Sequence, residues 1–304
     1  MFSNLKGSSH AVIAYLLWGL IPLYFHFLYQ ANMNELISLR IIFSLPLVWL
    51  VKKLFRVKSV SLSTALKNKK SLLLCFIAGS LNIVSLYAFT WALTTGQVLA
   101  ASLGYFMTPI FTIMLGILFL KDKLTIMQKL AVLLAIIGLS YQVFSNGELP
   151  WLSLIMGSFF AVYGLVKKYI KFDTFTTLYF ELFTILPFAL IYMLVTIFNG
   201  DSTAFNSDLM TLFLYIGAAP VTLLPLIFFA IALKKTTLTV IGLIQYLEPS
   251  IHFVLAVVLF NEQMELSKFI SFSFIWLGLI LCSLEAWRNR AKVKTQTLTE
   301  AYTG

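Results

Sequence analysis

ASLGYFMTPIFTIMLGILFLKDKL, residues 101–124, aligns without a gap with IGLIQYLEPSIHFVLAVVLFNEQM, residues 241–264, when the chain is shifted over itself by 140 residues. Pro109 then meets Pro249, and the register continues into the segments that flank the two stretches. A register of this length with both prolines in place indicates an internal duplication. The chain is therefore predicted to consist of two related halves.

The composition excludes a water-soluble class of protein. Of the 304 residues, 60% are hydrophobic and only 11% are charged, which leaves too little polar surface to coat a soluble globule. A transmembrane helix needs about 20 mostly apolar residues to cross roughly 30 Å of hydrocarbon. The sequence predicts an all-α integral membrane bundle of ten such helices, at residues 10–29, 35–54, 71–93, 99–120, 127–144, 150–169, 175–197, 209–232, 238–260 and 266–287.

The duplication divides the ten predicted helices equally. Residues 1–145 are expected to form the first five-helix repeat, residues 146–290 the second, and residues 291–304 a cytoplasmic tail. Because five is odd, the second repeat must enter the membrane upside down relative to the first. Inverted repeats are typical of transporters, in which the substrate site lies near mid-membrane between the repeats and access alternates between the two sides.

The distribution of positive charge predicts how the chain lies in the membrane. Of the 22 lysines and arginines, 20 fall before the first span, after the second, fourth, sixth and eighth spans, or after the last one. Positively charged loops stay in the cytoplasm, so both termini are predicted to be cytoplasmic. The cations form short clusters between apolar runs, which indicates a lipid bilayer and not nucleic acid as the partner. Indoles favour the membrane interface, and four of them fall near predicted span ends: Trp18, Trp49, Trp151 and Trp287.

Two polar stripes are the main candidates for a substrate site, because ionisable groups inside spans are costly unless they have a function or a partner. Gln245, Glu248 and His252 follow spacings of three and four and therefore share one helical face. The repeat register gives a matching stripe of Tyr105, Thr108 and Thr112. The stripes are expected to face each other, and they either line a central cavity or act as polar groups that hold helices together.

The two aligned prolines add to this expectation. Pro109 and Pro249 have no N–H to donate to the carbonyls of Tyr105 and Gln245, four residues earlier. Carbonyls freed at membrane depth must line protein or water.

Arg40 and Glu181 are a candidate charge pair. Arg40 lies inside the second predicted span, and the register pairs it with Glu181 in the seventh. Because Arg40 keeps its proton, it requires a carboxylate or an anionic substrate, and Glu35 and Glu248 are further possible counter-charges. Two interpretations stay open. The pair is either a permanent contact that fixes helix packing, or Arg40 anchors a substrate carboxylate or forms half of a gate.

Glu248 near mid-membrane suits a proton carrier, and His252 lies one turn away. These two residues would either couple export to the proton gradient or form a functionally silent hydrogen-bonded pair. Around them, the predicted substrate site includes an amide and aromatic rings that can stack against an amphipathic or cationic solute, namely Asn82, Trp91, Tyr163 and Tyr246.

Four stretches carry a resemblance to a known family: LLWGLIPLYF (16–25), ASLGYFMTPIFTIMLGILFLKDKL (101–124), FAVYGLVKK (160–168) and IQYLEPSIHFVLAVVLFNEQ (244–263). The chain resembles the RarD-type branch of the drug/metabolite transporter superfamily over nearly its whole length, including both EamA-type repeats. The resemblance implies a ten-helix permease or exporter of the bacterial inner membrane, monomeric or a weak homodimer, with substrates that range from amino acids to drugs. Glu248 stands where a small residue is expected before the proline, so a proton-coupling role for it would be particular to this chain.

The resulting hypothesis is a secondary transporter that exports small amphipathic metabolites, such as amino acids or drug-like compounds, by alternating access. No G-x-x-x-x-G-K-[ST] loop is present, so a gradient must drive uphill transport, and no cofactor is expected. A channel is the alternative, although the polar residues cluster at mid-depth and do not suggest a continuous polar pore. A membrane-embedded enzyme is less favoured, because the three histidines are widely separated and no H-E-x-x-H or C-x-x-C motif offers a metal site.

Overall fold

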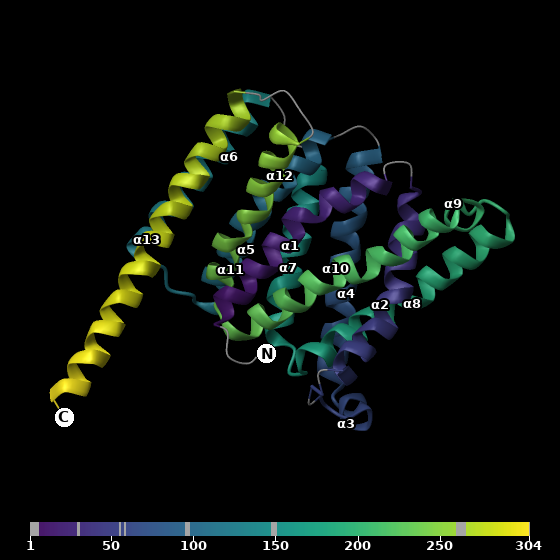
Figure 1. Cartoon of the computed structure of the whole chain (residues 1–304), viewed down its shortest axis with the longest axis horizontal. Coiled ribbons are helices and arrows are strands. Elements are labelled where there is room, and N and C mark those ends of the chain that lie inside the picture. Colours follow the sequence, from purple (N-terminus) through teal and green to yellow (C-terminus); the bar gives the residue numbers. More distant parts are fainter. Residues whose placement is uncertain are drawn as a thin grey trace.

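In the computed structural model the chain folds into helices joined by short connections (Figure 1). The structure describes residues 6–28, 31–54, 56–57, 59–94, 98–146, 151–259 and 266–303, and within them it leaves aside the side chains of residues 62, 90, 92–94, 98–103, 146, 256, 286 and 289–303. No strand occurs in the described ranges. The all-α fold class predicted from the sequence is therefore confirmed.

The helices follow the predicted spans closely. The first half of the chain forms α1 (Gly7–Phe25), the 3-10 turn η1 (His26–Leu28), α2 (Met33–Leu54), the short α3 (Leu62–Lys67), α4 (Lys69–Thr94), α5 (Val98–Leu120) and α6 (Ile126–Asn146). The second half forms α7 (Trp151–Tyr169), α8 (Thr174–Phe198), the short α9 (Thr203–Asn206), α10 (Leu209–Lys235), α11 (Leu238–Gln245), α12 (Leu247–Val258) and α13 (Leu266–Thr303).

Eight helical segments of the described chain are long and apolar enough to cross a membrane. They lie in α1, α2, α4, α6, α8, α10, α11 with α12, and α13. The other two predicted spans correspond to α5 and α7. Of these, α5 qualifies only as a shorter apolar helix, Gly104–Leu120, and α7, with Lys167 and Lys168 in its last turn, is not among the eight. A multi-pass membrane bundle is therefore shown, and the count of ten spans stays a prediction.

Polar caps fix where several helices begin. At the start of α8, Asp173 accepts the backbone N–H groups of Phe175 and Thr176, each at 3.0 Å. At the start of α10, Asp208 accepts the backbone N–H of Thr211 at 3.1 Å. Hydrogen bonds from the Thr211 side chain and backbone stabilise the carboxylate and lower the pKa of Asp208. Between such caps, lipid leaves the helix as the way to satisfy every backbone group within one segment.

The helix contacts repeat from one half of the chain to the other. The contact of α1 with α10 matches that of α7 with α4, and the contact of α5 with α7 matches that of α12 with α1. Three contacts join a helix to its own counterpart: α2 with α8, α5 with α11, and α6 with α13. Reciprocal contacts of this kind arise when a two-fold relation connects two copies of one unit.

The packing of α6 against α13 shows the same reciprocity at single residues. A Cβ added to Gly138 would lie 2.8 Å from the carbonyl oxygen of Ser271, and one added to Gly278 would lie 3.1 Å from the Cα of Ala131. Gly138 and Gly278 are equivalent in the 140-residue register, and so are Ala131 and Ser271. Both glycines therefore allow the same close approach of the two helices, seen once from each partner.

Polar contacts tie the connections together at the two ends of the bundle. At one end, which carries most of the lysines and arginines, carboxylates accept hydrogen bonds from residues of other connections: Asp122 from Thr239, Asp173 from Val60, and Glu285 from Thr125. We call this the cation-rich end. Helix α1 begins there, since Gly7 lies against the backbone of Lys235. Helix α13 extends toward the same side as α3 (Figure 1).

Candidate functional site

The ninth predicted span is broken where α5 is continuous. Helix α11 ends at Gln245 and α12 begins at Leu247, so the expected single helix of residues 238–260 divides at Tyr246. Pro249, which has no N–H for the carbonyl of Gln245, accounts for the break. The equivalent Pro109 lies inside α5, which continues through it. Only the second repeat therefore starts a new helix within the membrane.

The two predicted polar stripes meet where α5 crosses α11 and α12. The rings of Tyr105 and His252 make an edge-to-face contact with centroids 5.3 Å apart. The Thr112 hydroxyl donates to the carbonyl of Thr108 in its own helix at 2.9 Å and also lies 3.4 Å from the side-chain oxygen of Gln245. In the repeat register Tyr105 is equivalent to Gln245 and Thr112 to His252, so one contact is the counterpart of the other.

Thr108 and Tyr246 take part in packing at this crossing. The Thr108 hydroxyl donates to the carbonyl of Gly104 in its own helix at 2.7 Å. Tyr246 is buried among Phe106 and Phe272, and its hydroxyl donates to the carbonyl of Phe106 at 3.5 Å. Both predicted site residues thus use their hydroxyls within the protein.

Glu248 is the buried acidic group of this region. It lies in the first turn of α12, and the start of a helix favours negative charge. Its side chain is 9% exposed, and within the described chain its carboxylate has no hydrogen bond and no ion pair. Tyr105 from α5 and Tyr15 from α1 lie within electrostatic range of it.

His252 does not form the expected pair with Glu248. Its Nε2 lies 3.4 Å from the carbonyl oxygen of Trp18 in α1. We call Tyr15, Trp18, Tyr105, Glu248 and His252 the central cluster, because they bring α1, α5 and α12 together around one carboxylate.

Aromatic rings connect the central cluster to α7 and α10. The rings of Trp18 and Phe229 lie 5.3 Å apart, and Phe229 stacks on Tyr163 at 6.2 Å. Trp18 was expected near a span end, but it lies in this aromatic core, where it also contacts Phe160 at 6.0 Å. Hydropathy gives no signal for this position, because an indole well inside a span can face either the core or the lipid.

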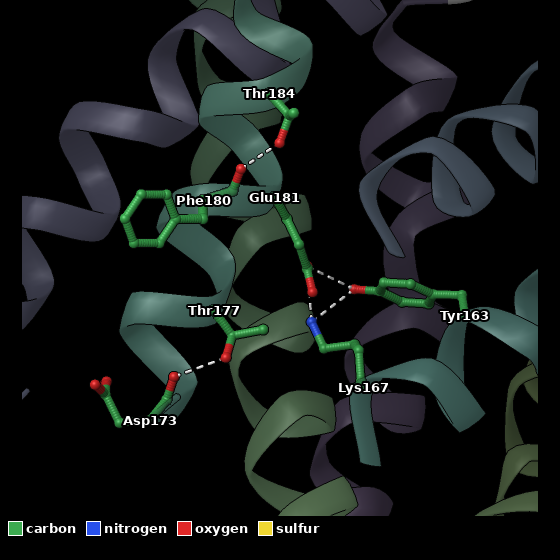
Figure 2. A network of polar contacts seen from close by, with 7 residues as sticks. All are labelled: Tyr163, Lys167, Asp173, Thr177, Phe180, Glu181 and Thr184. Atoms are coloured by element: carbon green, nitrogen blue, oxygen red, sulfur yellow. Dashed lines mark hydrogen bonds and ion pairs between the residues drawn. The ribbon is translucent and has the colours of Figure 1, made fainter. Parts of the chain in front are cut away.

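Tyr163 belongs to a buried ion-pair network that the sequence did not reveal. Lys167 donates to the Glu181 carboxylate at 2.8 Å, and the Tyr163 hydroxyl donates to the same oxygen at 3.2 Å and accepts from Lys167 at 2.9 Å. Figure 2 shows Tyr163 and Lys167, both from α7, converging on Glu181 from α8. The relative exposures of the Lys167 and Glu181 side chains are 3% and 6%. We call these three residues the lysine network.

Lys167 was counted among the loop cations because it lies at the end of a span. The available signal was its spacing of four from Tyr163, which places the two side chains on one helical face. Glu181 keeps one oxygen, Oε1, buried without a hydrogen-bond partner.

Arg40 is not paired with Glu181 as predicted. In the described residues it makes no hydrogen bond or ion pair, and its electrostatic neighbour is Tyr163. Glu35 is also occupied elsewhere, because its carboxylate accepts from Ser202 and from Thr203. The Glu181 carboxylate is already paired with Lys167 from α7, although α2, which carries Arg40, packs against α8.

Two predicted site residues lie away from the central cluster. Trp91 in α4 is 60% exposed, so it faces the surroundings of the bundle. Asn82, also in α4, is half-buried and makes no hydrogen bond in the described part of the chain. The structure therefore brings together Tyr105, Gln245, Glu248 and His252, and separately Tyr163 and Glu181.

Comparison with known proteins decides the family. The model of the EamA-like transporter family matches the chain twice, at residues 5–143 and 150–284. The chain belongs to the EamA-like transporter family. The RarD-type resemblance is confirmed as well, because Protein RarD of Escherichia coli is 33% identical over 281 residues, covering 92% of this chain and 95% of that protein.

Other relatives of this EamA-like transporter are similar over comparable lengths. Uncharacterized transporter PA0485 of Pseudomonas aeruginosa is 35% identical over 285 residues, 93% of this chain and 95% of the relative. Uncharacterized transporter YojE of Bacillus subtilis is 32% identical over 292 residues, 94% of this chain and 97% of the relative. A solved structure titled "Crystal structure of protein" has a TM-score of 0.69 at 16% identity, covering 92% of this chain and 98% of that one, which supports the fold alone.

Proposed function

We propose that this EamA-like membrane transporter is a secondary exporter of small amphipathic metabolites, such as amino acids or drug-like compounds, and that the central cluster is its substrate site. One observation carries the proposal. The Glu248 carboxylate lies at the start of a helix inside the bundle, within electrostatic range of Tyr105 and Tyr15, and makes no ion pair or hydrogen bond in the described chain. Such a group is costly in a membrane unless a solute, a proton or water satisfies it.

We also propose that access alternates between the two sides, with ten spans arranged as two inverted repeats, residues 1–145 and 146–290. The reciprocal contacts support this, because the main contacts between the two halves occur in equivalent pairs. Two equivalent halves have two near-equivalent arrangements, in which the central cluster opens toward one side or the other. The cation-rich end is then cytoplasmic, with both chain termini, in the bacterial inner membrane.

Arg40 and Glu181 enter the proposal as parts of a gate with Lys167. In the present arrangement Glu181 is bound to Lys167, and its second oxygen has no partner. Arg40 lies within electrostatic range of Tyr163 and also has no counter-charge in the described chain. In the alternate arrangement, Glu181 takes Arg40 as its partner. Arg40→Gln should then slow flux without changing the stability of the present arrangement. If the variant loses both flux and stability, Arg40 would be assigned to packing.

Solute counterflow in proteoliposomes tests the main proposal. Vesicles loaded with an unlabelled solute from a panel of amino acids and drug-like amphiphiles should accumulate the labelled solute with saturable kinetics. Tyr105→Ala should raise the half-saturating concentration about tenfold, because it removes a ring able to stack on a cationic or aromatic solute. Trp91→Ala is the matched control, since that ring is 60% exposed and should leave affinity unchanged. Flux that never saturates would favour the channel alternative.

The role of Glu248 in coupling is tested by imposing a pH gradient on the same vesicles. The groups that face it are Tyr105 from α5, Tyr15 from α1 and His252 from its own helix. Glu248→Gln should leave saturable counterflow intact and abolish the response to the gradient, whereas Glu248→Asp should keep part of it. An unchanged response in Glu248→Gln would remove the coupling role.

A further inference from the structure

The end of α2 carries a group of cations that has no role in the transport proposed above. Lys52, Lys53 and Arg56 line a hollow at the surface together with Trp49 and Val57. The ammonium group of Lys53 lies 5.1 Å from the centre of the Trp49 ring. We call these five residues the α2 hook.

Arg56 is placed in the hook by an unusual backbone conformation. Its φ is +48°, in the left-handed region, while its N–H donates to the carbonyl of Lys53 and the N–H of Val57 donates to that of Lys52. This pair of bonds closes a helix end at a position that glycine normally occupies. A cation held there against its backbone preference indicates a use for the side chain.

The equivalent end of α8 shows what the second half of the chain does at this point. Gly200 has a φ of +75°, its N–H donates to the carbonyl of Ile197, and the N–H of Asp201 donates to that of Thr196. The hydrogen-bond pattern is the same as at the end of α2, and the residue is the expected glycine. Arg56 is therefore not required by the helix end itself.

The cations of the hook have no counter-charge within the described chain. Lys52 and Arg56 make no ion pair or hydrogen bond there through their side chains. Among the described side chains of the same end, the carboxylates are occupied: Asp122 accepts from Thr239, Asp173 caps α8, and Glu285 accepts from Thr125. The hook thus presents three positive charges that an external anion can neutralise.

We propose that the α2 hook binds the phosphodiester headgroup of an anionic phospholipid. The charge of the hook complements a phosphate, and the planar guanidinium of Arg56 matches its geometry. Apolar surface for the acyl chains lies beside it, because Trp49, Leu50 and Leu54 are 54%, 52% and 71% exposed. An indole at the membrane interface next to a cluster of cations faces the headgroup layer, where a soluble anion would leave this apolar surface without a partner.

The purified full chain in neutral detergent, titrated with phosphatidylglycerol or phosphatidylcholine, tests this assignment. Native mass spectrometry should show saturable retention of phosphatidylglycerol in preference to phosphatidylcholine. Each cation removed should weaken retention about fivefold. The variant Lys52→Gln/Lys53→Gln/Arg56→Gln should therefore lose the preference. The matched variant Lys67→Gln/Lys69→Gln/Lys70→Gln, which removes three exposed lysines from the same end, should keep it.

Arg56→Gly separates binding from folding. Glycine favours the left-handed conformation, so this variant should fold at least as well as the original chain and still retain phosphatidylglycerol about fivefold less. Equal losses in the hook variant and in the matched variant would reduce the site to general surface charge and overturn the proposal. Competition by millimolar inorganic phosphate as effective as that by the lipid would also overturn it, because the occupant would then be a soluble anion.

Discussion

Glu181 and Glu248 are both buried carboxylates of the second repeat, but their partners differ. Glu181 receives an ammonium and a phenol within 3.2 Å, and the whole lysine network is closed to the surroundings. Glu248 makes no hydrogen bond or ion pair in the described chain, and the tyrosines within its electrostatic range are Tyr15 and Tyr105. The charge of Glu181 is therefore neutralised by Lys167, whereas that of Glu248 has no counter-charge in the described chain.

The equivalent positions in the first repeat sharpen this contrast. Thr108 stands where Glu248 does, and its hydroxyl is satisfied within α5 by the carbonyl of Gly104. One half of the crossing is therefore a continuous helix with internal hydrogen bonds, and the other is a broken helix with an acidic group at the break. The proposed substrate site lies at this asymmetry between the two related halves.

Glu181→Gln should have the largest effect on stability. Removing one partner of a buried ion pair leaves Lys167 as an uncompensated charge, which costs about 3 kcal/mol of the free energy of unfolding. Unfolding in detergent micelles, followed by helical signal against temperature or denaturant, measures it. Lys167→Met should lower the free energy of unfolding by a similar amount, because it leaves the Glu181 carboxylate as an uncompensated charge.

The double variant Lys167→Met/Glu181→Gln is the control for that effect. With both charges gone, most of the loss should be recovered, so the two single effects should fail to add. Fully additive losses would mean that the two side chains act separately and that the lysine network does not act as one unit.

A smaller effect is expected from two tyrosines that differ in the same way as the carboxylates. Tyr163→Phe removes a hydroxyl that donates to Glu181 and accepts from Lys167, and should cost about 2 kcal/mol. Tyr15→Phe removes a buried hydroxyl without a hydrogen bond in the described chain, and should be neutral or slightly stabilising. The same unfolding assay compares them, and equal losses would contradict the difference between the two clusters.

The fold was accessible from sequence because its causes are local and periodic. Apolar runs of span length predicted the long helices, and the gapless register between Pro109 and Pro249 predicted which helices are counterparts. The break at Tyr246 was not predicted, although the proline behind it was noted. Because both repeats carry the proline, the packing around it decides which of the two helices breaks.

The polar contacts were accessible only in part. Spacing placed Gln245, Glu248 and His252 on one face, and the register correctly brought that face to α5. The role of Lys167 was missed because a charge at the end of a span is usually assigned to a loop. A lysine side chain is nevertheless long enough to turn inward. Trp91 was misplaced because hydropathy does not say which side of a helix faces lipid.

Glu248→Gln should have the smallest effect on folding, and it completes the comparison with Glu181→Gln. The amide has the shape of the carboxylate, and no cation in the described chain loses a partner when the charge is removed. The free energy of unfolding should therefore change by less than about 1 kcal/mol, and any change should be toward higher stability, because a buried charge without a partner opposes folding. The same micelle unfolding assay decides it. A loss as large as that of Glu181→Gln would mean that Glu248 has a structural partner, and the central cluster would then be a packing contact like the lysine network.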